Sequence, residues 1–365
     1  MSGGVDSAVS AFLLKKDGHD VIGANMRFWE YKEVCATDAN TQKSRITSCC
    51  SPEDLADAEN TARGIGVPFY ALKMEADFRE KVIEPFIADY RAGRTPNPCV
   101  HCNTFIKFGE FYEKADALSF DKIATGHYAD IVKLPNGRYA VAPATDKRKD
   151  QSYYLYGLSQ AALERTVFPL AKLTKNEVRE IAEQNNIRVA AKPDSQEICF
   201  IPDNDYRKFL KRENVEFQTG FFRDVQGRIL GKHTGKENFT VGQRRGLQIA
   251  LGEPRYVIEI LDNGDVIIGT REELERDTFY LIEPVFQGIA KDSLSPEGLD
   301  VKVQVRYNSE PVSAVLYEAE NNTLKIQLTE RVWAITPGQA GVIYHKEDGY
   351  ILCGGKIRLL PPNVA

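Results

Sequence analysis

The chain has 365 residues, which exceeds the size of one small module and favours two or three domains. Hydrophobic residues make up 42% and charged residues 27%, close to the values of ordinary globular proteins, so wholesale disorder is excluded. No apolar run reaches the roughly 18 residues that a membrane-spanning helix needs. The first residues form neither the basic stretch nor the apolar core of a secretory signal, so we expect a cytoplasmic protein with no membrane partner.

The net charge of −5 excludes a uniformly basic surface of the kind that coats many nucleic-acid-binding proteins. A nucleic-acid partner would have to meet local basic patches on an acidic body. The seven cysteines, an odd number at uneven spacing, do not suggest a disulfide scaffold in a reducing compartment. They indicate metal binding, thiol chemistry or ordinary burial, depending on position.

Up to about residue 200, short apolar runs alternate with amphipathic segments, which is typical of an α/β domain with a parallel sheet. The predicted elements are, in order, a helix from Val5 ended by Gly18, a strand over 21–26, a helix starting at Ser51-Pro52, a strand over 69–72, a helix over 82–90 and a short strand at 123–127. Pro135-Asn136-Gly137 predicts a tight hairpin turn, and Thr174 with Glu177 predicts a capping box.

Beyond about residue 215, glycines become frequent and apolar residues alternate with polar ones. Val301, Val303 and Val305 show this period of two, which indicates antiparallel strands and a small barrel. We therefore expect three parts: an α/β domain over 1–202, a small central domain over 203–277 and a C-terminal β-barrel over 278–365.

The segment Ser2-Gly3-Gly4-Val5-Asp6-Ser7 opens the first predicted helix. Two adjacent glycines let backbone N–H groups approach an anion, and a helix N-terminus adds unpaired donors and partial positive charge. Ser7 can donate a hydroxyl to a phosphate, and Asp6 can help to hold Mg²⁺. A serine-capped turn is the alternative, but the whole string before an amphipathic helix favours phosphate binding.

This string resembles the pyrophosphate loop of the PP-loop ATP pyrophosphatases, which use ATP to adenylate a substrate oxygen and release pyrophosphate. The loop alone leaves several synthetases and tRNA-modifying enzymes open. In that superfamily a buried strand precedes the loop, whereas this chain begins at the loop itself. We therefore expect the native protein to contain further residues upstream.

Further motifs narrow the resemblance to the tRNA-specific 2-thiouridylases. Besides the loop, the motifs are Gly93-Arg94-Thr95-Pro96-Asn97-Pro98, Cys102-Asn103, Ala124-Thr125-Gly126-His127-Tyr128, Lys149-Asp150-Gln151-Ser152-Tyr153, Cys199-Phe200-Ile201, Gly242-Gln243-Arg244-Arg245-Gly246-Leu247 and Thr336-Pro337-Gly338-Gln339. They occur in order along essentially the whole chain. The resemblance implies a PP-loop domain with a parallel sheet, a small central domain and a C-terminal antiparallel β-barrel.

The resemblance also implies ATP-dependent 2-thiolation of the wobble uridine of tRNA. Adenylation would turn the 2-carbonyl oxygen of uracil into a leaving group, and Cys199 would carry the incoming sulfur as a persulfide. A cysteine desulfurase would deliver that sulfur, directly or through sulfur-relay proteins. Cys102 would act as the nucleophile that leaves a transient disulfide with Cys199. Cys99 stands where the family often has aspartate, and with a lowered pKa it would serve as an acid/base group.

Other uses of these cysteines stay open. Cys99, Cys102 and Cys199 would supply three ligands of a [4Fe-4S] cluster whose fourth iron carries sulfide. The Cys99–Cys102 spacing is also half of a zinc site, with Cys49-Cys50 as the other half. The persulfide route ranks first, the cluster second and zinc third. For Cys35 and Cys353, ordinary burial or accidental exposure is the better interpretation.

Matching positions predict the ligand contacts. The ATP-binding set is Met1, Ser2, Gly3, Gly4, Val5, Asp6, Ser7, Met26 and Gly126. The tRNA-binding set is Asn97, Pro98, Cys99, His127, Lys149, Asp150, Gln151, Arg306, Tyr307 and Gln339. Basic clusters at 147–149 and 207–212 would meet tRNA phosphates, and the wobble base would be extruded into a pocket.

Two rival functions remain. The first is a PP-loop ligase or amidotransferase for a small metabolite, which would need neither Cys102 nor Cys199. The second is a tRNA-binding protein without catalysis, which the absence of a strand before the loop favours. Pyrophosphate release that depends on tRNA discriminates among these functions.

Overall fold

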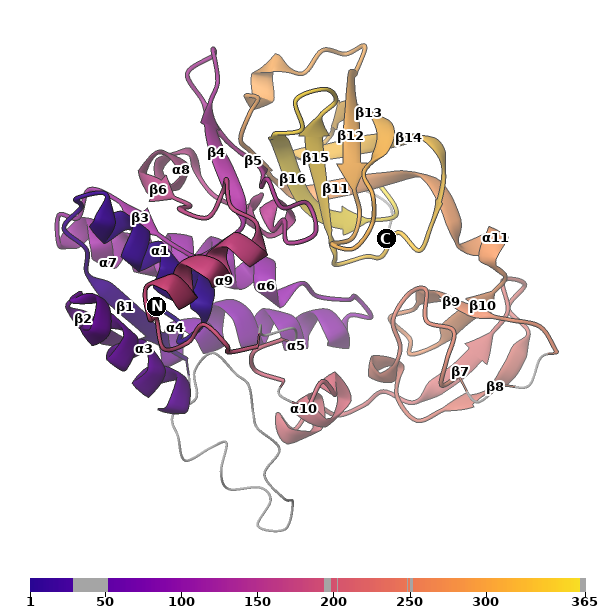
Figure 1. Cartoon of the computed structure of the whole chain (residues 1–365). Coiled ribbons are helices and arrows are strands. Elements are labelled where there is room, and N and C mark those ends of the chain that lie inside the picture. Colours follow the sequence, from indigo (N-terminus) through magenta and orange to yellow (C-terminus); the bar gives the residue numbers. More distant parts are fainter. Residues whose placement is uncertain (29–51, 194–197, 202, 248, 250–251, 362–365) are drawn as a thin grey trace, which may run out of the picture.

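The computed structural model describes residues 1–28, 52–193, 198–201, 203–247, 249 and 252–361 (Figure 1). Cys35, Cys49 and Cys50 lie outside these residues, as does the segment 194–197 before Cys199. Within them, no helix is long and apolar enough to cross a membrane.

The first elements follow the local sequence signals. They are α1 (Val5–Lys16), β1 (Gly23–Arg27), α3 (Pro52–Ile65) and β2 (Phe69–Lys73). Gly18 adopts a positive φ of 89° just after α1, where a residue without a Cβ ends a helix at little cost. The predicted helix start at Pro52 and the predicted strand at Phe69 are confirmed.

Two long helical segments follow, and each contains a π-helical stretch. The first consists of α4 (Glu75–Phe78), η1 (Arg79–Ile83) and α5 (Glu84–Arg91). The second consists of α6 (Pro98–His101), η2 (Cys102–Glu110) and α7 (Phe111–Ala117). The second segment begins only at Pro98 because proline disfavours helix at the residue before it and suits the first helical position.

The predicted parallel pairing is confirmed, but among the described residues the strands form two separate pairs and not one continuous sheet. β1 pairs with β2, and β3 (Ile123–Ala124) pairs with β6 (Thr166–Val167). The antiparallel hairpin of β4 (Ala129–Lys133) and β5 (Tyr139–Pro143) confirms the predicted turn between them. The first residues of the chain lie between the two parallel pairs.

Short helices complete the α/β part of the chain: η3 (Ser152–Leu155), α8 (Gln160–Arg165), α9 (Lys175–Gln184) and α10 (Tyr206–Arg212). The predicted capping box is present, because Thr174 accepts from the Glu177 N–H and the Glu177 carboxylate accepts from the Thr174 N–H. Phe209 and Leu210 of α10 pack in one apolar cluster with Phe86 of α5.

The middle of the chain forms a four-stranded sheet in the order β8-β7-β10-β9. Its elements are β7 (Gly220–Arg223), β8 (Ile229–His233), η4 (Lys236–Asn238), β9 (Tyr256–Ile260), β10 (Val266–Gly269) and the short helix α11 (Arg271–Leu274). Phe222, Val257 and Ile268 form the centre of its small core.

The last part is a closed barrel in the order β11-β14-β13-β12-β15-β16, as predicted. Its elements are β11 (Glu275–Phe286), η5 (Lys291–Ser293), β12 (Leu299–Gln304), β13 (Val312–Ala319), β14 (Thr323–Trp333), β15 (Ala340–His345) and β16 (Ile351–Arg358). Val301 and Val303 are buried while Lys302 between them is exposed, so the alternation marks the inner face. Cys353 is fully buried in this barrel, which confirms ordinary burial.

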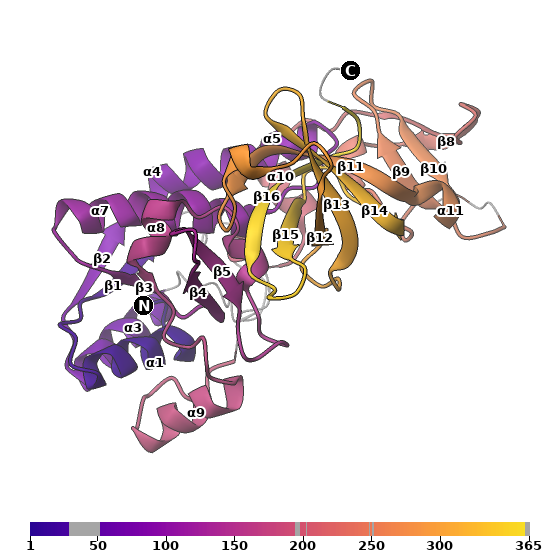
Figure 2. The same cartoon turned by 90° about the horizontal axis from the view of Figure 1, so that it is seen from above.

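The barrel packs against the α/β domain beside the β4–β5 hairpin (Figures 1 and 2). The contact is fixed by the buried side chain of Gln287, whose Nε2 donates to the carbonyl oxygens of Leu155 and Tyr156 at 2.9 and 3.0 Å. Its Oε1 accepts from the Val141 N–H at 3.0 Å. Because each polar atom of this buried amide is satisfied, the interface holds one defined arrangement.

Candidate functional site

The predicted phosphate loop has the backbone that an anion site requires. Gly3 has a φ of 79°, and a Cβ there would collide with the carbonyl oxygen of Asp54. Gly4 is an extended N-cap without a side-chain hydrogen bond, so the first N–H groups of α1 stay available. The Ser7 hydroxyl accepts from the Ser2 N–H at 3.0 Å and donates to the Gly4 carbonyl at 3.1 Å.

Both parallel pairs contribute to the surroundings of this loop. The Met1 amino group donates to the Ala24 carbonyl of β1, two residues before Met26. On the other side, Gly126 follows β3 and lies close to the loop. A Cβ added to Gly126 would be 2.8 Å from the Ser7 nitrogen. Gly126 is therefore in direct contact with the loop, and Met1 contacts the strand that contains Met26.

Asp6 is held by two side chains from distant parts of the chain. The Lys175 ammonium donates to both carboxylate oxygens at 2.7 and 2.9 Å, and the Tyr128 hydroxyl donates to Oδ1 at 2.8 Å. The Lys175 side chain is only 10% exposed. Both oxygens of Asp6 therefore already accept hydrogen bonds in the free protein.

The two predicted sulfur-transfer residues pack against the same apolar cluster. Cys102 begins η2 and is 9% exposed, and Cys199 lies in the turn that the Ile201 N–H closes on the Ile198 carbonyl at 2.9 Å. Both cysteines contact the cluster that contains Phe200, and Met26 of β1 packs on it as well. The fold thus brings both cysteine motifs, far apart in the sequence, to one apolar cluster that Met26 of β1 also contacts.

Cys99 lies on the exposed side of α6, one turn before Cys102. Asn97 caps this helix, because its side chain accepts from the Val100 N–H at 3.3 Å. Pro98 is buried at the first helical position. The described residues contain no group of three His, Cys, Asp or Glu side chains that could hold a metal ion.

A pair of tyrosines stands beside Cys99. The rings of Tyr154 and Tyr307 lie 4.4 Å apart at an angle of 33°. Burial raises the pKa of both hydroxyls, and nearby negative charge raises it further, from Cys99 at Tyr154 and chiefly from Asp150 at Tyr307. Tyr307 comes from the barrel and Tyr154 from η3, so this aromatic surface forms only when the two domains meet.

Two further predicted tRNA contacts, Asp150 and Gln151, form hydrogen bonds within the protein. Asp150 accepts from the Ala144 N–H at 2.8 Å and from the Ser152 hydroxyl at 2.7 Å, while its burial raises the pKa of its carboxyl. Gln151 accepts from the Tyr128 N–H at 3.0 Å. These bonds shape the segment that presents Lys149.

Arg306 of the barrel lies over the Trp333 ring, with its guanidinium carbon 4.8 Å from the ring centre. Its Nε atom is buried and has no hydrogen-bond partner among the described residues. Burial lowers the pKa of this guanidinium, although arginine still keeps its charge at neutral pH.

His127 is held in a largely apolar setting. Its ring packs near Phe108 and Phe168, and its Nδ1 lies 2.7 Å from the Thr125 hydroxyl. Burial, and secondarily the positive charge of Lys107, lower the pKa of His127 well below the value of a free histidine. The side chain is therefore neutral at pH 7, and its contact with tRNA stays a prediction.

Gln339 has structural partners that the sequence did not reveal. Its Nε2 donates to the carbonyl oxygens of Thr95 and Pro96, both at 3.0 Å. This barrel residue thereby holds the segment that leads to Asn97. Its proposed contact with tRNA stays a prediction.

The two basic clusters differ in their partners. Lys147 and Arg148 are exposed. In the second cluster, Arg207 donates to the Asn238 carbonyl, while the Lys208 and Arg212 side chains each lie 3.7 Å from an aspartate. The first cluster is therefore the better candidate for contact with an external phosphate.

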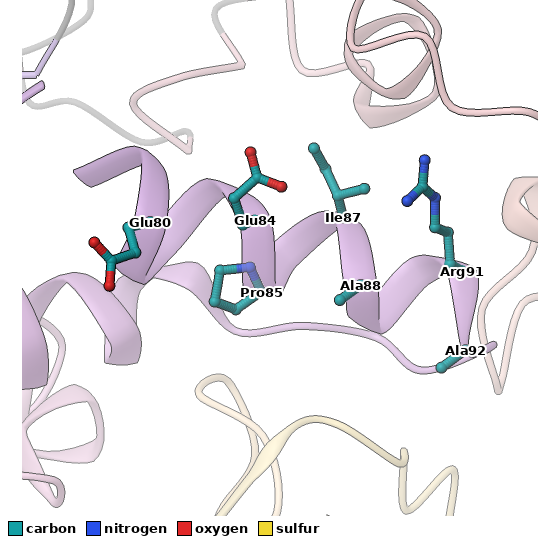
Figure 3. Close-up of a pocket in the computed structure, with 7 residues that line it drawn as sticks. All are labelled: Glu80, Glu84, Pro85, Ile87, Ala88, Arg91 and Ala92. Atoms are coloured by element: carbon teal, nitrogen blue, oxygen red, sulfur yellow. The ribbon is translucent and has the colours of Figure 1, made fainter. Parts of the chain in front are cut away.

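A groove of about 640 Å³ runs along one face of α5 (Figure 3). It is lined by Glu80, Glu84, Pro85, Ile87, Ala88, Arg91 and Ala92. None of the predicted site residues lines it, so it is separate from the phosphate loop and the cysteines.

Three family models match successive parts of the chain. They are described as a tRNA methyl transferase HUP domain over residues 1–203, a tRNA methyl transferase PRC-barrel domain over 207–270 and an aminomethyltransferase beta-barrel domain over 276–357. A "tRNA-specific 2-thiouridylase MnmA" of Leptospira interrogans is 53% identical over 358 residues, covering 98% of this chain and 93% of the relative. The chain belongs to the tRNA-specific 2-thiouridylase family.

Other members of this 2-thiouridylase family cover the chain equally well. The protein of the same name from Leptospira biflexa is 51% identical over 98% of this chain and 92% of its own length. The one from Clostridioides difficile is 43% identical over 98% of this chain and 96% of its own length. The resemblance predicted from the motifs and the three-part architecture are both confirmed.

Two contacts to predicted site residues were not predicted from the sequence, that of Lys175 with Asp6 and that of Tyr154 with Tyr307. Lys175 follows the predicted N-cap Thr174, and nothing local distinguishes it from an exposed lysine of a first helical turn. Tyr154 directly follows a recognised motif and would have been found by extending that motif by one aromatic residue.

Proposed function

We propose that this protein uses ATP to convert the 2-carbonyl group of the wobble uridine of tRNA into a 2-thiocarbonyl group. The observation that supports this proposal is that two cysteine motifs far apart in the sequence pack on one apolar cluster. Cys102 and Cys199 contact one apolar cluster, and Met26 in the same cluster belongs to the strand that Met1 contacts. A ligase for a small metabolite would need neither cysteine.

In the first step the uracil oxygen attacks the α-phosphate of ATP, and pyrophosphate leaves. The N–H groups at the start of α1 and the Ser7 hydroxyl would bind the phosphates, while Gly126 leaves room beside them. Mg²⁺ would arrive with ATP and neutralise part of the charge on its phosphates. The chain itself holds Asp6 through Lys175, which keeps that carboxylate from repelling the nucleotide.

In the second step the terminal sulfur of a Cys199 persulfide attacks C2 of the pyrimidine, and AMP leaves with the former carbonyl oxygen. The Cys102 thiolate then attacks the Cys199 sulfur, so the sulfur–sulfur bond to the base breaks and 2-thiouridine is released. The Cys102–Cys199 disulfide stores the two-electron oxidation, and a cellular thiol reductant reopens it. A cysteine desulfurase or sulfur-relay protein would reload Cys199.

Cys99 would move a proton near the base, since it is exposed on the same helix as Cys102. In the competing route, Cys99, Cys102 and Cys199 hold an iron–sulfur cluster. A chemical assay distinguishes this route from the persulfide route. Protein purified without oxygen would be assayed for iron, labile sulfide and thiolation. Activity in an iron-free preparation would eliminate the cluster.

The tRNA would bind where the barrel meets the α/β domain. Arg306, with its unsatisfied Nε, and the exposed Lys147 and Arg148 supply positive groups. The Tyr154–Tyr307 pair offers a surface on which an extruded base can stack. We place this reaction in the cytoplasm, where tRNA and thiol reductants are present together.

The deciding experiment is Cys199→Ser, with Cys353→Ala as a control for loss of a cysteine far from the loop. We expect Cys199→Ser to make no 2-thiouridine, as measured by mass spectrometry of digested tRNA, while tRNA-dependent pyrophosphate release persists. Cys353→Ala should still thiolate. Undiminished 2-thiouridine from Cys199→Ser would overturn the assignment, and tRNA binding without any ATP turnover in the unsubstituted protein would favour a non-catalytic role.

A further inference from the structure

We infer that Lys356 and Asp89 are a positioning pair, through which the barrel fixes the cysteine-bearing segment 97–102 for sulfur transfer. This inference rests on the proposed function. Lys356 lies on β16 of the barrel, and Asp89 lies on α5 of the α/β domain (Figure 1). Neither residue belongs to a predicted site.

The pair is buried and bidentate. The Lys356 ammonium donates to both oxygens of Asp89 at 2.7 and 2.8 Å. The Asp89 side chain is only 4% exposed and that of Lys356 is 20% exposed. A carboxylate removed from water to this degree depends on its partners, so the pair defines how α5 sits on the barrel.

Asp89 also forms hydrogen bonds with the segment that precedes the cysteines. The Arg94 guanidinium donates to Asp89 Oδ1 at 2.8 Å, and the Arg94 N–H donates to the Asp89 carbonyl at 2.8 Å. One buried carboxylate therefore connects Lys356 of the barrel to Arg94, three residues before Asn97.

A second set of barrel contacts holds the next two residues. The Thr95 N–H donates to the Pro337 carbonyl at 2.9 Å, and Gln339 donates to the Thr95 and Pro96 carbonyl oxygens. Gly338 has a φ of 90°, and an added Cβ there would lie 2.8 Å from the Thr95 oxygen. The barrel thus binds residues 95 and 96 directly and residue 94 through Asp89, up to the N-cap of α6.

The helix that follows carries both thiols without an intervening loop. Asn97 caps α6, α6 presents Cys99, and η2 begins at Cys102. A shift at Arg94 would therefore move both thiols relative to Cys199, which lies in a separate turn. The phosphate loop is anchored elsewhere, by Lys175 and Tyr128.

This arrangement predicts that loss of the pair separates the two half-reactions. Adenylation should continue in Lys356→Met, whereas sulfur transfer should fall, since a misplacement of about 1 Å costs up to roughly 100-fold in rate. The waiting adenylate would react with water, giving AMP and the starting uridine. We expect the ratio of AMP released to 2-thiouridine formed to rise at least about tenfold over that of the unsubstituted protein.

Matched variants distinguish positioning from general damage. Arg138→Met removes another cation that ties the α/β domain to the barrel, through the Phe286 and Gln287 carbonyl oxygens, but it lies on the β4–β5 hairpin. It should leave the ratio unchanged. Lys356→Arg keeps the charge and should restore most of the coupling. If Lys356→Met does not fold, the double variant Asp89→Asn with Lys356→Gln removes both charges together and should show the same raised ratio.

The outcomes are decisive. An unchanged ratio in Lys356→Met, or in the double variant if that is the one that folds, overturns the inference. An equal rise in Arg138→Met overturns it too, because any tie between the domains would then suffice. If the unsubstituted protein makes AMP but no 2-thiouridine from a persulfide donor, the proposed function fails instead.

Discussion

Lys175 neutralises a carboxylate at the centre of the phosphate loop, so its removal should weaken ATP binding specifically. The Lys175 ammonium donates to both oxygens of Asp6. The Lys175 side chain is 10% exposed, and that of Asp6 is 32% exposed. In Lys175→Met the methylene volume is largely kept, but Asp6 faces the triphosphate with its charge uncompensated. Repulsion between the two anions should then raise the dissociation constant for ATP.

The magnitude follows from the geometry. Two unit charges about 4 Å apart repel by about 4 kcal/mol at an effective dielectric constant of about 20, and the 32% exposure of Asp6 reduces this to about half. A loss of about 2 kcal/mol corresponds to a roughly 30-fold weaker affinity. We expect a similar loss in the free energy of unfolding, because Asp6 loses its buried partner in the free protein as well.

The assay is titration of ATP in the presence of Mg²⁺, together with tRNA binding and urea unfolding. Lys172→Met is the matched control, since Lys172 pairs with Asp130 but its side chain is 76% exposed. Such an exposed pair should change affinity and stability by less than about 1 kcal/mol. An affinity for ATP in Lys175→Met within twofold of the unsubstituted value would refute the reasoning.

Two further predictions concern tRNA binding and acid stability. Arg306→Met should weaken tRNA binding and lower the salt dependence of the binding constant by about one phosphate contact. Arg271→Met removes another arginine that lies over Trp333 and should change neither quantity. Equal salt dependence of tRNA binding in the two variants would contradict this prediction. Burial lowers the pKa of His127, so below about pH 6.5 the unfolded chain binds a proton that the folded chain does not, and folding stability falls as the pH falls. Urea unfolding at pH 7.5 and 5.5 should show that His127→Gln removes about 1 kcal/mol of this acid destabilisation, and an unchanged pH dependence would show that the ring is protonated in the folded state.

Local signals sufficed for several elements. The Thr174–Glu177 capping box and the helix start at Pro52 each depend on residues within one helical turn, so the residues that decide them are neighbours in sequence. The π-helical stretches η1 and η2 escaped prediction, because a helix of apolar period gives no local sign of a wider turn.

The family also followed from the sequence, because its motifs are short strings in a fixed order. The α/β character and the barrel could therefore be predicted from the sequence and are confirmed, while anion binding by the loop and the roles of Cys102 and Cys199 stay predictions. Each of these features depends on residues that are close together along the chain or on a simple alternation of apolar and polar residues.

Only the tertiary structure decided which side chains support those groups. Lys175 reaches Asp6 across 169 positions, Gln339 reaches Thr95 across 244, and Lys356 reaches Asp89 across 267. A buried charge or amide takes whatever partner domain packing brings to it, and no local pattern encodes that partner. The chemistry of the site is thus readable along the chain, whereas its positioning depends on how the barrel sits on the α/β domain.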